Sequence, residues 1–396
     1  MPKLSNKGIE LPFSPIRKLV SFADDAKSRG VEIFHLNIGQ PDIESPKEAL
    51  NAVTKSNLKL LPYGPSQGSL SYRKNLCKYY NNHNIHTNPN QIVITTGASE
   101  ALTFCLNVIC DAGDEIIIPE PFYANYNGFA TAANVKVVPI IPDKEEIFEI
   151  PSTKKIISKI NKKTKAILIC NPSNPTGYVY KEKEIESLCE IALKNDIFII
   201  VDEVYREFIY DKIKHYSVLK NSKYKSISIM IDSVSKRYSL CGARVGFIVS
   251  KNKSFVKNIL KFAQLRLSPP TYALMASEAA LKAPKSYMLN VLKEYSNRRK
   301  ILLENLNKIK GVSATKPMGA FYCIAKLPVK NAENFCRFLL KDFSDLNQTI
   351  MLAPAQGFYS TPGYGIDKVR FAFVLDSSKL IRATQILEKA LKVYPN

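Results

Sequence analysis

The segment 232–246 concentrates residue types that can bind and react with a phosphorylated ligand. Ser233 and Ser235 precede Lys236, and Arg244 follows this lysine eight residues later. Two hydroxyl groups and a guanidinium group can bind one phosphate, while the lysine supplies an amine. An isolated lysine in a lysine-rich chain is usually a solvated surface group. The two serines and the arginine nearby change this expectation. A lysine whose pKa is lowered by burial or a neighbouring cation becomes a nucleophile, and we predict that Lys236 is catalytic.

A carboxylate and a phenol follow the apolar run 198–201. Burying the carboxylate of Asp202 at the end of a strand costs free energy unless it has a partner. A protonated pyridine nitrogen would be such a partner, and a ring held in that state works as an electron sink. The alternative is that Asp202 caps a following helix. Tyr205 faces the same way on a helical turn and can hydrogen-bond a ring oxygen, unless it only packs.

Two further turns carry polar groups that can contact the same ligand. The segment 171–177, Asn-Pro-Ser-Asn-Pro-Thr-Gly, is rigid and non-helical, and the amide of Asn174 can donate to a phenolate oxygen unless the segment is only a turn. Gly97, Ala98 and Ser99 are small residues at the start of a predicted helix. Exposed amides and the helix dipole favour an anion there, although many strand-to-helix turns look alike.

The elements that must position these residues alternate between apolar and amphipathic runs. The predicted strands are 92–94, 115–118, 135–138, 166–170, 198–201, 226–231 and 245–249. Continuous apolar strands separated by helices predict an α/β fold whose mainly parallel sheet is covered on both faces. Ligands bind beyond the carboxyl ends of such strands, and the polar turns described above lie there.

The pattern of apolar and charged residues changes after about residue 284. A long charged helix (287–308) and scattered strands there predict a smaller α+β domain. We expect residues 1–45 to form an N-terminal segment that packs with the small domain. Residues 46–284 would form the large domain and residues 285–396 the small one. Within the N-terminal segment, Ser14 and Pro15 predict a helix start, and 33–39 predicts a short strand.

The net charge of +21 over 396 residues raises the question of an anionic partner such as nucleic acid or a membrane surface. The basic residues occur in short, scattered groups with acidic residues between them, whereas a nucleic-acid footprint should be clustered. We therefore expect neither a nucleic-acid nor a membrane partner, and attribute the charge to a lysine-rich composition.

The eight cysteines form no Cys-x-x-Cys pair and no ligand spacing with the four histidines. Several lie in apolar runs, as Cys170 does, where a reduced cysteine is a small core residue. We expect neither a metal site nor a disulfide framework. The start of the chain lacks the apolar stretch of a signal peptide, and no window resembles a membrane span, which favours the cytoplasm.

Together these segments resemble the fold type I enzymes that use pyridoxal 5′-phosphate (PLP), specifically the class I/II aminotransferases similar to aspartate aminotransferase. The resemblance covers nearly the whole chain, in the family's order. The strings Asn-Pro-x-Asn-Pro-Thr-Gly and Ser-x-Ser-Lys…Gly-x-Arg-x-Gly are its most specific part. The other matching segments are 37–42 (Asn-Ile-Gly-Gln-Pro-Asp), 63–68 (Tyr-Gly-Pro-Ser-Gln-Gly), 317–322 (Pro-Met-Gly-Ala-Phe-Tyr) and 369–371 (Val-Arg-Phe).

The resemblance implies that Lys236 carries PLP as a Schiff base and later shuttles the substrate proton. It implies that Asp202 pairs with the pyridine nitrogen, and that Asn174 and Tyr205 contact the ring oxygen. The residues implied in phosphate binding are Gly97, Ala98, Ser99, Ser233, Ser235 and Arg244.

The remaining implied contacts concern the ring face, the substrate and a second subunit. Tyr123 falls where the family stacks an aromatic side chain on the ring. Arg370 would clamp the substrate α-carboxylate, with Gly39 and Asn174 beside it, although alone it would pass for a surface arginine. Tyr63 would reach the phosphate in the neighbouring subunit, which implies a homodimer.

The implied activity is transfer of the amino group of an α-amino acid to a 2-oxo acid such as 2-oxoglutarate. Dicarboxylate-specific relatives often have a lysine where this chain has Ser99, and Cys241-Gly242-Ala243 replaces a more usual Thr-Gly-aromatic before the phosphate arginine. The first departure puts aspartate specificity in doubt, although Arg266 or Arg17 could bind a distal carboxylate. The alternatives are another PLP reaction on the same fold, such as a C–S β-lyase or a synthase, and a non-catalytic regulator.

Overall fold

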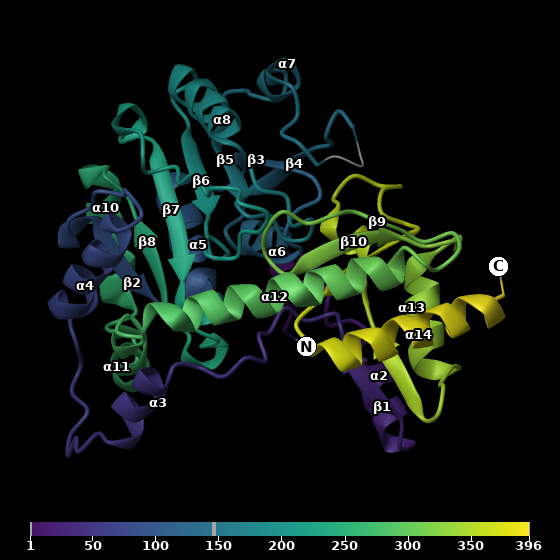
Figure 1. Cartoon of the computed structure of the whole chain (residues 1–396). Helices are drawn as coiled ribbons and strands as arrows, with labels where there is room; N and C mark the ends of the chain where they lie inside the picture. The colour runs from purple at the N-terminus through teal and green to yellow at the C-terminus, as the bar shows by residue number, and fades with distance from the viewer. Residues whose placement is uncertain (1, 145–147, 396) are drawn as a thin grey trace.

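The computed structural model describes residues 2–144 and 148–395 of the chain. Figure 1 shows two lobes connected by the long helix α12 (Lys285–Leu306), which runs from one lobe to the other. The lobe on the left contains the largest sheet. The lobe on the right contains the C-terminus together with α2 and β1 from the start of the chain.

Within the described residues, the largest sheet has seven strands in the order β2-β8-β7-β6-β5-β3-β4. All neighbours are parallel except β8, which runs antiparallel to both β2 and β7. The strands are β2 (Ile92–Thr95), β3 (Glu115–Pro119), β4 (Lys136–Ile140), β5 (Thr164–Cys170), β6 (Phe198–Asp202), β7 (Ser228–Ser233) and β8 (Gly246–Val249). The prediction of a mainly parallel sheet is therefore confirmed.

Both faces of this sheet are buried, which explains its continuous apolar runs. Successive side chains of a strand point to opposite faces. In β5, Ala166 and Leu168 pack into one hydrophobic cluster, while Ile167 and Ile169 pack into another on the opposite face. Helices cover the two clusters: α3 (Lys47–Thr54), α4 (Leu70–Asn81), α5 (Gly97–Ile109), α6 (Asn125–Ala132), α7 (Thr153–Ile157), α8 (Glu182–Lys194), α9 (Val234–Arg237), α10 (Lys253–Leu265) and α11 (Thr271–Ala280).

The second lobe is an α+β unit, as predicted. Its sheet has the order β12-β13-β10-β9, and β1 pairs in parallel with β11 beside it. The strands are β1 (Glu32–His35), β9 (Ser313–Ala314), β10 (Tyr322–Lys326), β11 (Gln348–Met351), β12 (Ala353–Pro354) and β13 (Lys368–Ala372). The helices are α2 (Val20–Ser28), α13 (Ala332–Lys341) and α14 (Ser377–Val393). The first helix, α1 (Asn6–Glu10), lies instead at α6 of the other lobe, where the Nζ of Lys7 donates to the carbonyl oxygen of Ala132. Short 3₁₀ turns in the two lobes are η1 (Pro89–Gln91), η2 (Ser222–Tyr224), η3 (Cys241–Ala243) and η4 (Ala355–Phe358).

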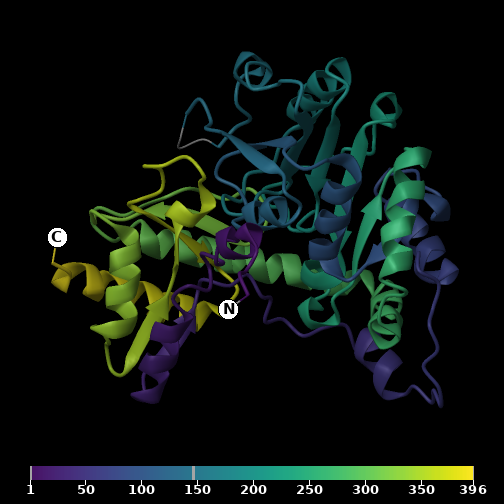
Figure 2. The same cartoon turned by 180° about the vertical axis from the view of Figure 1, so that it is seen from behind.

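The N-terminal segment lies against the C-terminal lobe, because β1 adds to β11 over residues 32–35 and 348–351. Figure 2 shows the same contact from behind, with the purple start of the chain beside the yellow-green end.

Two local predictions in this segment were wrong. The helix α2 begins at Val20 and not at Ser14, and residues 15–19 form a turn. Tertiary contacts hold this turn: a Cβ on Gly357 would lie 2.2 Å from Pro15, so the proline sits directly on that backbone. The predicted strand 33–39 ends at His35, since the backbone beyond it hydrogen-bonds side chains of the cavity described below.

Candidate active site

The carboxyl ends of strands β5, β6 and β7 and the start of α5 border a cavity of about 690 Å³. The N-terminal segment, β10 and β13 close it from the other lobe. Twelve residues predicted from the sequence line it: Gly39, Ala98, Ser99, Tyr123, Asn174, Asp202, Tyr205, Ser233, Ser235, Lys236, Arg244 and Arg370. Segments far apart in the sequence therefore converge on one space.

Lys236 lies in the short helix α9, directly after β7. Its Nζ donates a hydrogen bond of 2.8 Å to the carbonyl oxygen of Gly39 and lies 3.9 Å from the Sγ of Cys241. Burial lowers the pKa of Lys236; the Cys241 thiol opposes this, and the guanidinium groups of Arg370 and Arg244 add to it. A lowered pKa gives the amine a larger neutral fraction, which is the form that attacks a carbonyl carbon.

Asp202 is the last residue of β6 and is buried. Its Oδ2 accepts a hydrogen bond of 2.9 Å from the hydroxyl of Tyr126, and its Oδ1 accepts one of 3.3 Å from the backbone N–H of Val204. Burial raises the pKa of Asp202 to about 6, against these hydrogen bonds. A turn, and no helix, follows Asp202, so this residue is not a helix cap, although its bond from the Val204 N–H caps that turn. Tyr205 therefore lies on this turn and not on the helical turn expected from the sequence.

The start of α5 and the loops after β7 together form a cradle of hydrogen-bond donors at one end of the cavity. Ala98 and Ser99 lie in the first turn of α5, where backbone N–H groups have no intrahelical partner. A Cβ on Gly97 would lie 2.6 Å from the Nη2 of Arg244, and the φ of +77° at Gly97 is a backbone conformation that favours glycine. Amides, hydroxyls and one guanidinium group form a donor set suited to a phosphate.

The two serines of the cradle are tied to each other. The Ser233 hydroxyl donates to the Ser235 Oγ at 2.8 Å, and the Ser233 Oγ accepts from the backbone N–H of Ser235 at 3.0 Å. These bonds fix both side chains at the end of β7, where they line the cavity.

Arg370, in β13, is buried and held on several sides. Its Nη1 donates to the Oδ1 of Asn174 at 2.8 Å, and its Nη2 donates to the carbonyl oxygen of Asn37. The guanidinium lies against the rings of Tyr322 and Phe358, with its Cζ 4.3 Å and 4.8 Å from their centroids. The Nε of Arg370 has no hydrogen-bond partner within the described part of the chain, although it is buried. A rigid, desolvated guanidinium of this kind suits a carboxylate.

Three tyrosines line the same cavity. The hydroxyls of Tyr205 and Tyr322 are 2.8 Å apart, and a Cβ on Gly39 would lie 1.7 Å from the Tyr322 hydroxyl, so Gly39 makes room for that side chain. Tyr123 accepts a hydrogen bond of 2.9 Å from the Nδ2 of Asn125 and packs edge-on against Tyr126. The side chains of the three tyrosines line the same cavity as Lys236 and Asp202.

Residues 31–359 match the family model for aminotransferases of class I and II. The chain belongs to this family. It is 30% identical to an aspartate aminotransferase of Bacillus subtilis over 98% of both chains, and 29% identical to an aromatic-amino-acid aminotransferase of Thermococcus litoralis over 96% of both. A solved alanine aminotransferase from Pyrococcus furiosus superposes with a TM-score of 0.90 at 30% identity, covering 99% of this chain and 100% of that one. This aminotransferase is therefore a PLP-dependent enzyme with the fold type I architecture.

The cavity residues fit PLP by the chemistry of their donors. The cradle at α5 offers amides, hydroxyls and Arg244 to a phosphate, and Asp202 offers a buried carboxylate to a protonated ring nitrogen. Asn174 uses its Oδ1 for Arg370, which leaves its Nδ2 to donate to a ring oxygen beside Tyr205. The Tyr123 side chain lines the cavity, where a ring can stack on the pyridine. No part of the described chain clusters residues that could hold a metal ion.

Two predicted site residues of this aminotransferase do not line the cavity of its own chain: Gly97, which lies directly behind it against Arg244, and Tyr63. Tyr63 is 80% exposed and absent from the lining residues. Arg266, considered for a distal carboxylate, donates to the Oε2 of Glu100 and to the carbonyl oxygen of Ser66, both at 3.0 Å. Its alternative, Arg17, lines the cavity.

Three residues that shape the site were missed from the sequence: Asn37, Tyr126 and Tyr322. Asn37 and Tyr322 lie in segments 37–42 and 317–322, which carried the resemblance, but neither was given a role. Tyr126 lies at the start of α6, three residues after Tyr123, and this short spacing is the signal that would have brought it to the site.

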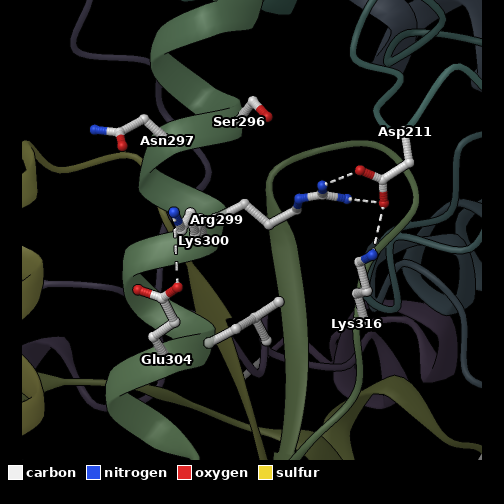
Figure 3. Close-up of a pocket in the computed structure, with 8 residues that line it drawn as sticks. Asp211, Ser296, Asn297, Arg299, Lys300, Glu304 and Lys316 are labelled. Carbon is white, nitrogen blue, oxygen red and sulfur yellow. Dashed lines mark hydrogen bonds and ion pairs between the residues drawn. The ribbon is translucent and has the colours of Figure 1, made fainter.

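A second, smaller hollow of about 450 Å³ lies along α12 (Figure 3) and shares no lining residue with the first. Asp211 binds both Arg299 and Lys316 there, and these hydrogen bonds hold the pKa of Asp211 at about 2. Lys300 pairs with Glu304 on the same helix. The ion pairs of Asp211 connect α12 to the loop that carries this residue and to Lys316.

The enzyme has no helix, over residues 2–144 and 148–395, that is long and apolar enough to cross a membrane.

Proposed function

We propose that this chain transfers the amino group of a small α-amino acid to a 2-oxo acid such as 2-oxoglutarate. One observation carries the proposal: Lys236, Asp202 and the Arg370–Asn174 pair line a single cavity. Bound PLP supplies an electron sink that stabilises negative charge developing at the substrate Cα. This chain's own residues do the binding, the orientation and the proton transfer.

Lys236 has two tasks in this proposal. Its Nζ holds the cofactor covalently before substrate arrives, and then takes up and returns the proton of the substrate Cα. A general base works best when its pKa lies near the working pH, and burial lowers the pKa of Lys236 in that direction. The Gly39 carbonyl, 2.8 Å from Nζ, orients the amine toward the substrate side of the cavity.

Arg370 binds the α-carboxylate of every substrate in this proposal. Asn174 and the Asn37 carbonyl fix two of its nitrogens, so little side-chain entropy remains to be lost on binding. The rings of Tyr322 and Phe358 exclude water from the guanidinium faces, which strengthens its interaction with an anion.

The cradle residues Gly97, Ala98, Ser99, Ser233, Ser235 and Arg244 bind the cofactor phosphate. Asp202 keeps the ring nitrogen protonated, while Asn174 and Tyr205 donate to the ring oxygen and Tyr123 stacks on the ring. In a site that excludes water, fixed donors of this kind cost no reorganisation during the reaction.

We also propose a homodimer in which Tyr63 reaches the phosphate of the partner subunit. Tyr63 lies on an exposed stretch with Leu58, Leu60 and Leu61, whose exposed fractions are 46%, 76% and 52%. Exposed apolar side chains gathered in this way usually mark a protein–protein interface. We further propose a cytoplasmic location. All eight cysteines are free, as expected in a reducing compartment.

We place the domain boundaries at residues 46 and 285. Pairing of β1 with β11 supports a segment 1–45 that belongs with the small domain. The start of α12 at Lys285 supports a small domain over 285–396, leaving 46–284 as the large domain.

The proposal is tested with a panel of amino acids added to the purified holoenzyme. Loss of the cofactor's visible absorption band, with recovery on adding a 2-oxo acid and appearance of the new amino acid, is the expected result. A β-substituted amino acid that gives pyruvate and ammonia without amino-group transfer would instead establish a lyase. A protein that holds PLP but converts no amino acid would be a regulator.

A further inference from the structure

Asn37 connects two parts of the cavity wall. It is buried, its carbonyl oxygen accepts from Arg370, and its Nδ2 donates to the carbonyl oxygen of Ile16 at 3.2 Å. Pro15 sits on the backbone of Gly357, where any Cβ would clash at 2.2 Å. The short turn that carries residues 15–19 is therefore fixed relative to Arg370.

Arg17 is the next residue after Ile16 on this turn, and it lines the cavity. Its side chain makes no hydrogen bond or ion pair with any other described residue, and it is exposed. Burial raises the pKa of Tyr123, and Arg370, Arg17 and Arg244 oppose that rise. Arg17 and Arg370 thus act electrostatically on the same tyrosine.

One of the charged side chains that line the cavity has no assigned partner in the proposed complex with PLP and substrate. Within residues 2–144 and 148–395, the charged side chains that line the cavity are Arg17, Asp202, Lys236, Arg244 and Arg370. Asp202 and Lys236 are engaged by the cofactor ring and its linkage, and Arg244 by its phosphate. Arg370 is engaged by one substrate carboxylate. Arg17 is the remaining cation, and a substrate with a second carboxylate would neutralise it.

We propose that Arg17 binds the distal carboxylate of a dicarboxylic amino acid and of its 2-oxo acid counterpart. This inference rests on the proposed aminotransferase function and adds the substrate class to it. The substrate then spans from Arg370, at its α-carboxylate, to Arg17, at its far end.

Arg266 does not compete for this role within the chain. Arg266 already pairs with the Glu100 carboxylate at 3.0 Å, and this ion pair neutralises its charge, whereas Arg370 contacts only neutral oxygen acceptors. Moving Arg266 to a substrate would leave Glu100 without its cation in a partly buried place.

The test compares holoenzymes of the wild type, Arg17→Gln and Arg17→Lys. Lys18→Gln is the matched control, because it removes the adjacent positive charge, which pairs with Glu333 and does not line the cavity. Two ratios are measured: kcat/KM for aspartate over alanine, and, by calorimetry, the affinity for succinate over propionate. Both succinate and propionate can engage Arg370, but only succinate has a second carboxylate.

Arg17→Gln should lower both ratios roughly tenfold, the size of one charge-assisted hydrogen bond at a partly exposed position. Arg17→Lys should lower them less, and Lys18→Gln should leave them as in the wild type. Unchanged ratios in Arg17→Gln, or a selective loss of dicarboxylates in Arg266→Gln, would overturn the assignment while leaving the aminotransferase function intact. A wild type that converts neither aspartate nor alanine nor any other amino acid would refute the proposed function itself.

Discussion

The hydroxyl of Tyr126 donates a hydrogen bond of 2.9 Å to the Oδ2 of Asp202 at the buried end of β6. This bond and the one from the Val204 N–H stabilise the ionised carboxyl, yet burial still raises the pKa of Asp202 from 3.8 to about 6. The free protein therefore keeps a carboxylate in a place that disfavours its charge. A cationic partner such as a protonated ring nitrogen would remove that penalty.

The first prediction concerns the stability of the cofactor-free protein. Because the folded pKa of Asp202 lies above its unfolded value, the folded state binds more protons between pH 3.8 and about 6, and stability falls as pH rises through this window. About two pKa units correspond to about 3 kcal/mol. Asp202→Asn should be more stable relative to the wild type at pH 7.5 than at pH 4, by up to this amount, in urea unfolding.

The same variant separates the two roles considered for Asp202. It should still bind PLP, but its turnover should drop by several orders of magnitude, since the ring nitrogen loses the charge that keeps it protonated. A stability difference that does not vary with pH, together with near-normal turnover, would show that this carboxyl serves only local structure.

The second prediction identifies the covalent anchor. Reduction of the holoenzyme with borohydride, followed by peptide mapping, should place a pyridoxyl group on Lys236 alone. The chain offers many other lysines, but Lys236 lines the cavity and its pKa is lowered by burial. A label on any other lysine would contradict the assignment.

Much of this site was predictable from sequence because it follows from strand ends. Buried parallel strands carry continuous apolar runs, so their carboxyl ends, and the polar turns holding Asn174, Asp202 and Ser233, can be located without coordinates. The direction of β8 was not predictable in this way. Its run is as apolar as that of a parallel strand, and the connection 234–245 after β7 is long enough for either direction.

Contacts between residues distant in the sequence also could not be predicted. The Tyr205 and Tyr322 hydroxyls meet across 117 positions, and nothing local to either tyrosine indicates the other. The prediction that a helix begins at Ser14 was wrong for a similar reason. A proline after a serine is a good helix start, but packing of Pro15 on Gly357 holds the turn in a non-helical form.

The third prediction tests the shared active site. In the proposed dimer, Tyr63→Ala and Lys236→Ala damage different subunits' contributions to one site. Mixing and refolding the two variants should therefore restore activity above the sum of the separate samples. Random pairing of equal amounts leaves about a quarter of the sites intact, so the recovered activity should not exceed about a quarter of the wild-type activity. A fully active wild-type monomer in sedimentation would exclude the shared site.

The last prediction concerns Arg370 and separates the common carboxylate from the variable end of the substrate. A buried arginine–carboxylate pair is worth about 2–5 kcal/mol on truncation. Arg370→Ala should therefore lower kcat/KM by roughly 30- to several-thousand-fold, since each 1.4 kcal/mol is about tenfold. The loss should be alike for aspartate, alanine and aromatic donors, because all of them carry the α-carboxylate.

Arg370→Lys is the matched control for this change. It keeps the charge but cannot reproduce the planar fork that contacts Asn174 and the Asn37 carbonyl, so activity should recover only in part. Far-ultraviolet circular dichroism and the absorbance of bound PLP would show that both variants remain folded and loaded. If Arg370→Ala weakened only dicarboxylic donors, Arg370 would be contacting the distal carboxylate, and the α-carboxylate would have to bind elsewhere in the cavity.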